Sequence, residues 1–198
     1  MPLNSADFDP DDVARLEAEG WRAYYDRRWL RVLRLVAELN RAEFRMPYHQ
    51  SLQAAYYIAR ATRAWAPVDH DVATVRRYIG AYYRLAGRYA QISSDPDTVA
   101  DLEIKYWNVH RRLIAVPDKA PFIAAVAELH VALFGIDSAT AHESALERVA
   151  ASNLVDDIVL RRSTDVEGDW TRLEQHLRKC YRIVAAAGQD HAMVGAAS

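Results

Sequence analysis

The feature that most constrains this chain is the spacing of its apolar side chains, which recur every three or four residues in segment after segment. One such series comprises Trp21, Tyr25, Trp29, Val32, Val36 and Leu39. This spacing places the side chains on one face of an α-helix. Sustained apolar–polar alternation bounded by hairpin turns, the pattern of a half-buried strand, is not found in the sequence. The pattern therefore predicts an all-α protein.

Prolines and capping residues divide the apolar series into segments. A first helix is expected from Pro10 to about Phe44, with a bend or break at Gly20, and a second between Pro47 and Pro67. The remaining expected segments are 69–86, capped by Asp69, and then 95–116, 121–134, 138–162 and 165–187. Short connections make neighbouring helices antiparallel. We therefore predict an irregular antiparallel bundle of six or seven helices.

Chain length and composition favour one domain. The 198 residues contain no Pro-, Ser- or Gly-rich linker, so residues 8–188 are expected to form a single helical domain, with flexible termini at 1–7 and 189–198. Cys180 is the only cysteine, which excludes an intramolecular disulfide and a Cys-based zinc site. The acidic N-terminus lacks the apolar segment of a secretory signal, and no apolar run is long enough to span a membrane. We expect a soluble cytoplasmic protein.

The charge distribution gives no reason to expect nucleic acid or an anionic membrane as a partner. The formal net charge is −2, whereas such partners select strongly basic surfaces. One basic row does occur on the first predicted helix, but Glu38 and Glu43 interrupt it; its members are Arg27, Arg31, Arg34, Arg41 and Arg45. We interpret it as a solvated face with pairs within the helix.

Metal sites are common in helical bundles. The Glu-x-x-His motif of ferritin-like proteins places two ligands on one helix face. None of the seven histidines has Asp, Glu or His three or four residues away on either side. Accordingly, no metal ligand is assigned.

A looser pair is formed by Glu103 and His110, which lie seven residues apart. This spacing resembles that of heme-oxygenase-like di-iron oxidases. The resemblance covers these two residues and implies, as an alternative function, a metal-dependent oxidoreductase with a Glu/His site across helices. Such proteins also carry a motif rich in His and Asp on a late helix, and the sequence around His176 does not match it. The simpler interpretation is a carboxylate at the helix flank and a hydrogen-bonded imidazole.

Catalytic residues cannot be assigned. His130 and Cys180 fall on apolar stripes, where a buried neutral imidazole and a structural thiol are expected. The sequence has neither a nucleophile elbow nor a Gly-rich phosphate loop. Whether the protein is an enzyme, and whether it uses a cofactor, is left open.

The most suggestive feature is the aromatic content of eleven Tyr, five Trp and four Phe. Ala-Tyr-Tyr occurs three times, at 23–25, 55–57 and 81–83. The buried hydroxyl groups of tyrosines need hydrogen-bond partners. The three pairs either line a shared pocket, or each places one tyrosine in the core and the other at a rim or dimer interface.

Two arginines follow these tyrosines at helical spacing, Arg28 after Tyr24 and Arg60 after Tyr56. Each can therefore stack on, or bond to, a tyrosine of its own helix. Arg60 lies beside an apolar stripe, and two interpretations remain. It forms an interior salt bridge, for example with Glu103 or Asp157, or it forms the floor of a cavity for an anionic or hydroxylated ligand.

These observations predict a non-catalytic small-ligand-binding or interaction domain. The expected ligand is a small polar or amphipathic molecule, and we also expect self-association as a homodimer through exposed aromatic residues. The candidate pocket residues are Tyr56, Tyr57, Arg60, Tyr82, Tyr83, Glu103 and His110.

Overall fold

The protein is all-α, as the sequence predicts. The computed structural model describes residues 3–4 and 7–196. Eight helices lie within these residues, rather than the expected six or seven: α1 (Pro10–Tyr25), α2 (Trp29–Phe44), α3 (Tyr48–Trp65), α4 (Val72–Ala86), α5 (Pro96–Leu113), α6 (Ala120–Phe134), α7 (Ser138–Val159) and α8 (Val166–Ala196). The short strands β1 (Leu3–Asn4) and β2 (Ala90–Gln91) pair in parallel, with Leu3 opposite Ala90.

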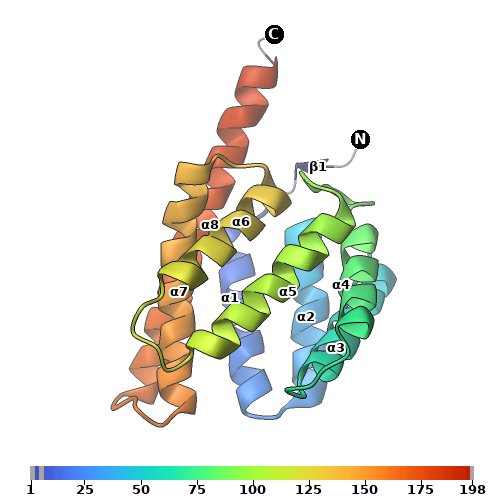
Figure 1. Ribbon diagram of the computed structural model, residues 1–198. Coiled ribbons are helices and arrows are strands. Elements are labelled where there is room, and N and C mark those ends of the chain that lie inside the picture. Colours follow the sequence, from blue (N-terminus) through green and yellow to red (C-terminus); the bar gives the residue numbers. More distant parts are fainter. Residues whose placement is uncertain (1–2, 5–6, 197–198) are drawn as a thin grey trace.

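The helices form a closed ring. Each helix packs on the next in sequence, and α8 packs against α1 to complete the circle. Figure 1 shows α7 and α8 side by side, and α5 crossing the front of the bundle. Because every helix has two ring neighbours, the inner faces of all eight converge on one central region.

Aspartates begin four of the helices. Asp9, Asp71, Asp95 and Asp137 are the N-caps of α1, α4, α5 and α7, and each side chain accepts hydrogen bonds from backbone N–H groups of the first turn. These bonds satisfy donors that have no partner within the helix. The expected cap of the third predicted helix, Asp69, is wrong by two residues, since Asp71 has that role.

The first predicted helix is divided at a different place from the one expected. It continues through Gly20 and stops at Tyr25; Arg27 then adopts a left-handed conformation, with φ of 58°. The reversal moves Trp29 to the start of α2, where 55% of the side chain is exposed. It also separates Arg28 from Tyr24, and Arg28 instead lies 3.6 Å from Asp26. The positions of Trp29 and Arg28 were therefore predicted wrongly.

The C-terminal helix continues beyond its expected end at Gly188 to Ala196 and extends past its neighbours (Figure 1). The flexible termini expected at 1–7 and 189–198 stay a prediction. Residues 1–2, 5–6 and 197–198 lie outside the described residues.

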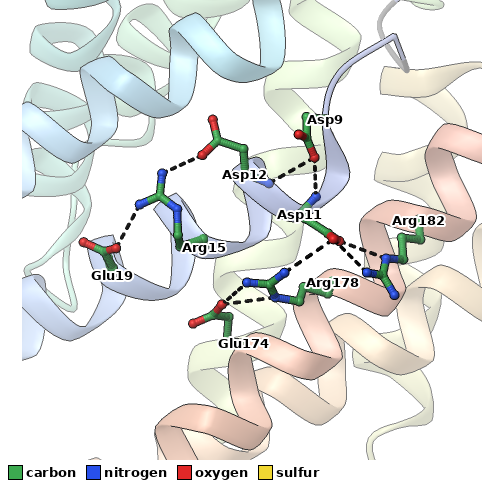
Figure 2. A network of polar contacts seen from close by, with 8 residues as sticks. All are labelled: Asp9, Asp11, Asp12, Arg15, Glu19, Glu174, Arg178 and Arg182. Carbon is green, nitrogen blue, oxygen red and sulfur yellow. Dashed lines mark hydrogen bonds and ion pairs between the residues drawn. The ribbon is translucent and has the colours of Figure 1, made fainter.

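Ring closure between α1 and α8 combines packing with surface ion pairs. Figure 2 shows Asp11 of α1 facing Arg178 and Arg182 of α8. The Arg182 guanidinium donates to both carboxylate oxygens of Asp11 at 2.8 and 2.7 Å. Beneath them, the ring of Phe8 meets Tyr181 edge to face at 5.6 Å. Exposed ion pairs contribute little, so the apolar contacts supply most of the stability of this closure.

The basic row is exposed at the surface, but only one of its ion pairs, Arg34 with Glu38, lies within the helix as expected, whereas Arg31 and Arg45 pair with residues outside α2. Arg31 pairs with Glu19 at 3.0 Å, Arg34 with Glu38 at 2.8 Å, and Arg45 with Asp7 at 3.3 Å. In the described part of the chain, no helix is both long and apolar enough to cross a bilayer.

Removal of an N-cap should weaken the fold measurably. We expect Asp137→Ala to lower the free energy of unfolding by about 1 kcal/mol, because the N–H groups of Ala139 and Thr140 lose their acceptor at 2.9 and 3.0 Å. Urea denaturation measures the change. Glu143→Ala, at an exposed position of the same helix, is the control and should have little effect. Equal losses in the two variants would contradict the capping role.

Candidate functional site

A cavity of about 590 Å³ lies inside the ring, and all eight helices contribute to its wall. Eleven of the lining residues are aromatic: Trp21, Tyr24, Tyr25, Phe44, Trp65, Tyr82, Tyr83, Tyr106, Trp107, Phe134 and Tyr181. Ionisable groups are set among these rings: Glu17, Glu43, Glu103, His110, Arg111, His130, Arg148 and Asp156. The cavity is therefore amphipathic.

The strongest polar contact of the wall joins α1, α7 and α8. Arg148 donates to both carboxylate oxygens of Glu17, at 2.9 and 2.6 Å, and the Tyr181 hydroxyl donates to the same carboxylate at 2.6 Å. The guanidinium also lies over the rings of Trp21 and Tyr106, at 5.7 and 5.9 Å. Burial alone would lower the pKa of Arg148, but the Glu17 charge outweighs it and raises that pKa well above its usual value. Arg148 is therefore a buried, permanently charged group with its charge neutralised.

Glu103 on α5 is held by neutral donors instead. Its carboxyl accepts hydrogen bonds from the Tyr83 hydroxyl at 3.0 Å and from the Trp107 indole N–H at 2.7 Å. Burial raises the pKa of Glu103, against the opposing effects of Arg148 and of these two donors. The side chain is fixed in position without a cation in contact.

Glu43 on α2 differs from Glu17 and Glu103 in its contacts. It is partly buried, facing the cavity, and forms no hydrogen bond or ion pair with any described residue. Burial raises the pKa of Glu43 to about 8; the charges of Glu17 and Glu103 add to the effect, and Arg148 opposes it. At neutral pH, therefore, Glu43 is mainly a protonated carboxyl group that presents both a donor and an acceptor to the cavity.

Two further polar pairs connect the helices around the cavity. The Tyr82 hydroxyl on α4 donates to the Asn40 side chain on α2 at 2.9 Å, and Asn40 donates to the Val36 carbonyl at 2.8 Å. His110 on α5 lies 3.1 Å from Asp156 on α7 and stacks on Phe122 at 4.9 Å. These contacts fix the wall, and the ring of His110 has little freedom to reorient.

His130 and Cys180 are buried, as predicted. The His130 Nδ1 lies 2.7 Å from the Ser144 hydroxyl, and burial lowers the pKa of His130 to about 3. Burial also raises the pKa of the Cys180 thiol to about 12. At neutral pH the imidazole is therefore uncharged and the thiol unreactive.

The rim of the cavity lies at the C-terminal ends of α1, α3 and α5. Tyr24 and Tyr25 both line the cavity and are about two-fifths exposed, at 39% and 40%. The Arg111 guanidinium stacks on Trp65, 3.3 Å from the ring centroid, and donates to the Trp65 carbonyl at 2.8 Å. Arg111 thus caps the last turn of α3 and holds an aromatic side of the entrance.

The structure brings together four of the seven predicted pocket residues. Tyr82, Tyr83, Glu103 and His110 line the cavity. Tyr56, Tyr57 and Arg60 are not part of its wall.

Tyr56 and Arg60 are excluded from the cavity because the face of α3 that carries them turns outward. Arg60 donates to the Tyr56 hydroxyl at 3.0 Å, the contact within the helix that the spacing predicts, and lies over Tyr78 at 5.0 Å. Arg60 therefore forms neither of the expected interior arrangements. Of the three Ala-Tyr-Tyr segments, two contribute tyrosines to the cavity, and the third does not.

Sequence reasoning missed Glu17, Glu43, Arg148 and Asp156. A signal was present for Glu43, which follows Val36 by seven residues and Leu39 by four, and so continues that apolar stripe. It was assigned instead to the charged face. Arg148 precedes the buried Val149 in a helix with little separation of apolar and polar faces, so its inward orientation had no comparable signal.

Glu103 and His110 line the same cavity but have different partners, Tyr83 and Trp107 for the first and Asp156 for the second. Within residues described by the structure, no group of three or more His, Cys, Asp or Glu side chains is placed to hold a metal ion. Comparisons of the chain with protein-family models, curated proteins and solved structures find no match.

The interior ion pair predicts a non-additive effect on stability. Arg148→Met should lower the free energy of unfolding by about 3–5 kcal/mol, because Glu17 is left as an unpaired buried charge. The double variant Glu17→Gln/Arg148→Met should lose less than Arg148→Met alone, because both charges are removed together. Guanidinium denaturation tests this. A double variant that loses the sum of the two single effects would contradict the pairing.

The raised pKa of Glu43 predicts that the stability of the folded protein depends on pH. Folding raises this pKa from its usual 4.5 to about 8, so the folded protein binds more protons than the unfolded chain between these values, and stability falls as pH rises through that window. The melting temperature of Glu43→Gln minus that of the native protein should therefore increase as the pH rises from about 5 to about 9.

Glu38→Gln is the matched control for that experiment. Its side chain lies on the same helix and pairs with Arg34 at the surface, so its difference from the native protein should stay constant over this range. Parallel melting-temperature profiles for Glu43→Gln and the native protein would show that Glu43 ionises normally.

Proposed function

We propose that this protein is a non-catalytic binding protein that holds a small amphipathic molecule in the cavity at the centre of its helical ring. The observation that carries the proposal is the cavity itself, about 590 Å³ in volume and lined by residues of all eight helices. Ligand sites in proteins have volumes of about 300–1,000 Å³ and combine an apolar wall with a few placed polar groups.

The composition of the wall supports an amphipathic ligand over a wholly apolar one. Aromatic rings supply a large, rigid contact area. Glu43 presents a carboxyl group with no partner among the described residues, and such a group inside a protein favours a ligand that completes its hydrogen bonds. We therefore expect an apolar body with at least one polar group.

Binding is preferred to the metal-dependent alternative because of the partners of Glu103 and His110. The two side chains are engaged separately, Glu103 by Tyr83 and Trp107 and the Nε2 of His110 by Asp156. The rigid contacts of the wall also suit recognition, because a pre-organised site loses little entropy when the ligand enters.

Self-association through exposed aromatic residues stays a prediction. Trp29 on α2, and Tyr48 and Tyr56 on α3, are 55%, 60% and 49% exposed, so two adjacent helices carry the side chains that such a contact would use. This expectation is independent of the cavity.

The binding function is tested with N-phenylnaphthylamine, an uncharged probe whose fluorescence rises in apolar surroundings. The native protein should give a saturable increase with one site per chain. Thr62→Trp adds bulk at a position that lines the cavity, and should weaken binding at least about tenfold by occupying part of its volume.

Ala59→Trp is the matched control. It adds the same side chain at an exposed position of the same helix and should leave the dissociation constant unchanged. Circular dichroism and melting temperature establish that both variants fold. A signal that does not saturate, or that is equal in the two variants, would mean that the probe does not enter the cavity.

A further inference from the structure

The ionisable groups of the cavity are not balanced in charge. Four carboxyl groups line the wall, from Glu17, Glu43, Glu103 and Asp156, and only two arginines do, Arg111 and Arg148. Arg148 is already paired with Glu17 through two hydrogen bonds. Arg111 lies at the rim, where it binds the backbone carbonyl of Trp65. Arg148 lowers the pKa of Glu43 and of Glu103 from a distance, but neither arginine forms an ion pair with these two glutamates within the described residues.

The two remaining glutamates interact with each other and with the same tyrosines. Each raises the pKa of Tyr82 and Tyr83, and Glu103 contributes to the raised pKa of Glu43. The Tyr82 and Tyr83 rings meet edge to face, with centroids 4.9 Å apart. Carboxyl groups and aromatic faces therefore occur together in this part of the wall. Both attract cations, the first by charge and the second by the ring quadrupole.

We propose that the ligand is an organic cation, an amine with an apolar body, whose ammonium group lies beside Glu43 and Glu103 against the rings of Tyr82 and Tyr83. This identification of the ligand class rests on the binding function proposed above. An ammonium group supplies the opposite charge that these carboxyl groups lack, and the remaining aromatic wall covers the apolar body. An anionic ligand would meet the carboxyl groups without a free arginine, which argues against it.

Binding of such a cation is coupled to a proton. The charged groups facing Glu43 are Glu17 from α1, Glu103 from α5 and Arg148 from α7. The neutral groups near it are the phenols of Tyr82, Tyr83 and Tyr181 and the thiol of Cys180.

These neutral groups do not ionise near neutral pH. Burial holds the pKa of each phenol well above 10, and raises that of the thiol to about 12. His130, also on the wall, has its pKa lowered to about 3 by burial and stays neutral. Glu43, whose pKa is about 8, is therefore the group that we expect to release a proton near pH 7 when a cation binds.

Three probes with one shared apolar body test the proposal: naphthylmethylamine, naphthylmethanol and naphthoate. At about pH 7 they present a cation, a neutral hydroxyl and an anion, respectively. Isothermal titration calorimetry should show that the amine binds at least about tenfold more tightly than the alcohol, a difference of about 1.4 kcal/mol, and that naphthoate binds most weakly. In buffers of different ionisation enthalpy, the amine should release protons on binding, and the alcohol should not.

Two variants assign the effect to the cavity carboxyl. Glu43→Gln should reduce the ratio of amine to alcohol affinity to below about threefold and abolish most of the proton release. Glu38→Gln, on the outer face of the same helix and paired with Arg34, should reproduce the native ratio. A native ratio in Glu43→Gln would overturn the role assigned to Glu43.

The outcomes distinguish this inference from the binding function. If the alcohol or naphthoate binds as tightly as the amine, and Thr62→Trp weakens that binding, the cavity binds ligands but does not select cations, and the inference is overturned alone. The same holds if N-phenylnaphthylamine enters the cavity and none of the three probes binds at about 1 mM. If neither N-phenylnaphthylamine nor any of the three binds, both proposals fail.

Discussion

The contact between Arg148 and Glu17 is the interaction on which the interior of this protein depends. It links α7 to α1, and through the Tyr181 hydroxyl it includes α8, so three of the helices that close the ring meet at one group of charges. A buried ion pair often adds little net stability compared with an apolar replacement, because both ions lose their hydration. What it does supply is a geometric requirement: the inner faces of these helices must place a carboxylate, a guanidinium and a phenol together. If the helices packed in a different register, these three groups would be separated, and a charge would be left unpaired in an aromatic interior.

A ring of eight helices explains why the interior contains a cavity. In a four-helix bundle, facing side chains meet at the centre and fill it. Here each helix packs mainly on its two ring neighbours, and the inner faces carry rigid rings, many of them tyrosines and tryptophans. Such side chains have few rotamers and need partners for their polar atoms. Tyr82 meets Asn40, Tyr83 and Trp107 meet Glu103, and each hydrogen bond fixes an aromatic ring at the wall. Rings held at the wall in this way are not free to collapse into the centre.

The fold was largely predictable because it follows from local rules. The three-to-four spacing identified the helical segments, and Asp95-Pro96 and Gly135 marked a helix start and a helix end correctly. The break after Tyr25 was not predictable in the same way, since Arg27 adopts a left-handed conformation that no glycine signals. The residues that line the cavity were harder to predict than the helix boundaries. Spacing along one helix gives the angle between two side chains, but which side turns toward the ring depends on both neighbouring helices. Arg60 and Glu43 are the two examples. Arg60 was expected in the interior but lies at the surface, whereas Glu43 was expected on a solvated face but lines the cavity.

Glu43 connects the stability of the protein to what it binds. A carboxyl group with its pKa raised to about 8 is destabilising at higher pH, because folding removes it from water and the charge of Arg148 only partly compensates the loss. Stability alone would favour glutamine or an apolar residue at this position. Any ligand that interacts with the ionised form more strongly than with the neutral form recovers part of this cost on binding, since linkage requires the same free energy to appear in the pKa and in the affinity. A cation satisfies that condition, and an anion reverses it. The unfavourable environment of Glu43 therefore becomes a preference for positively charged ligands, while Arg148, already satisfied by Glu17, remains structural.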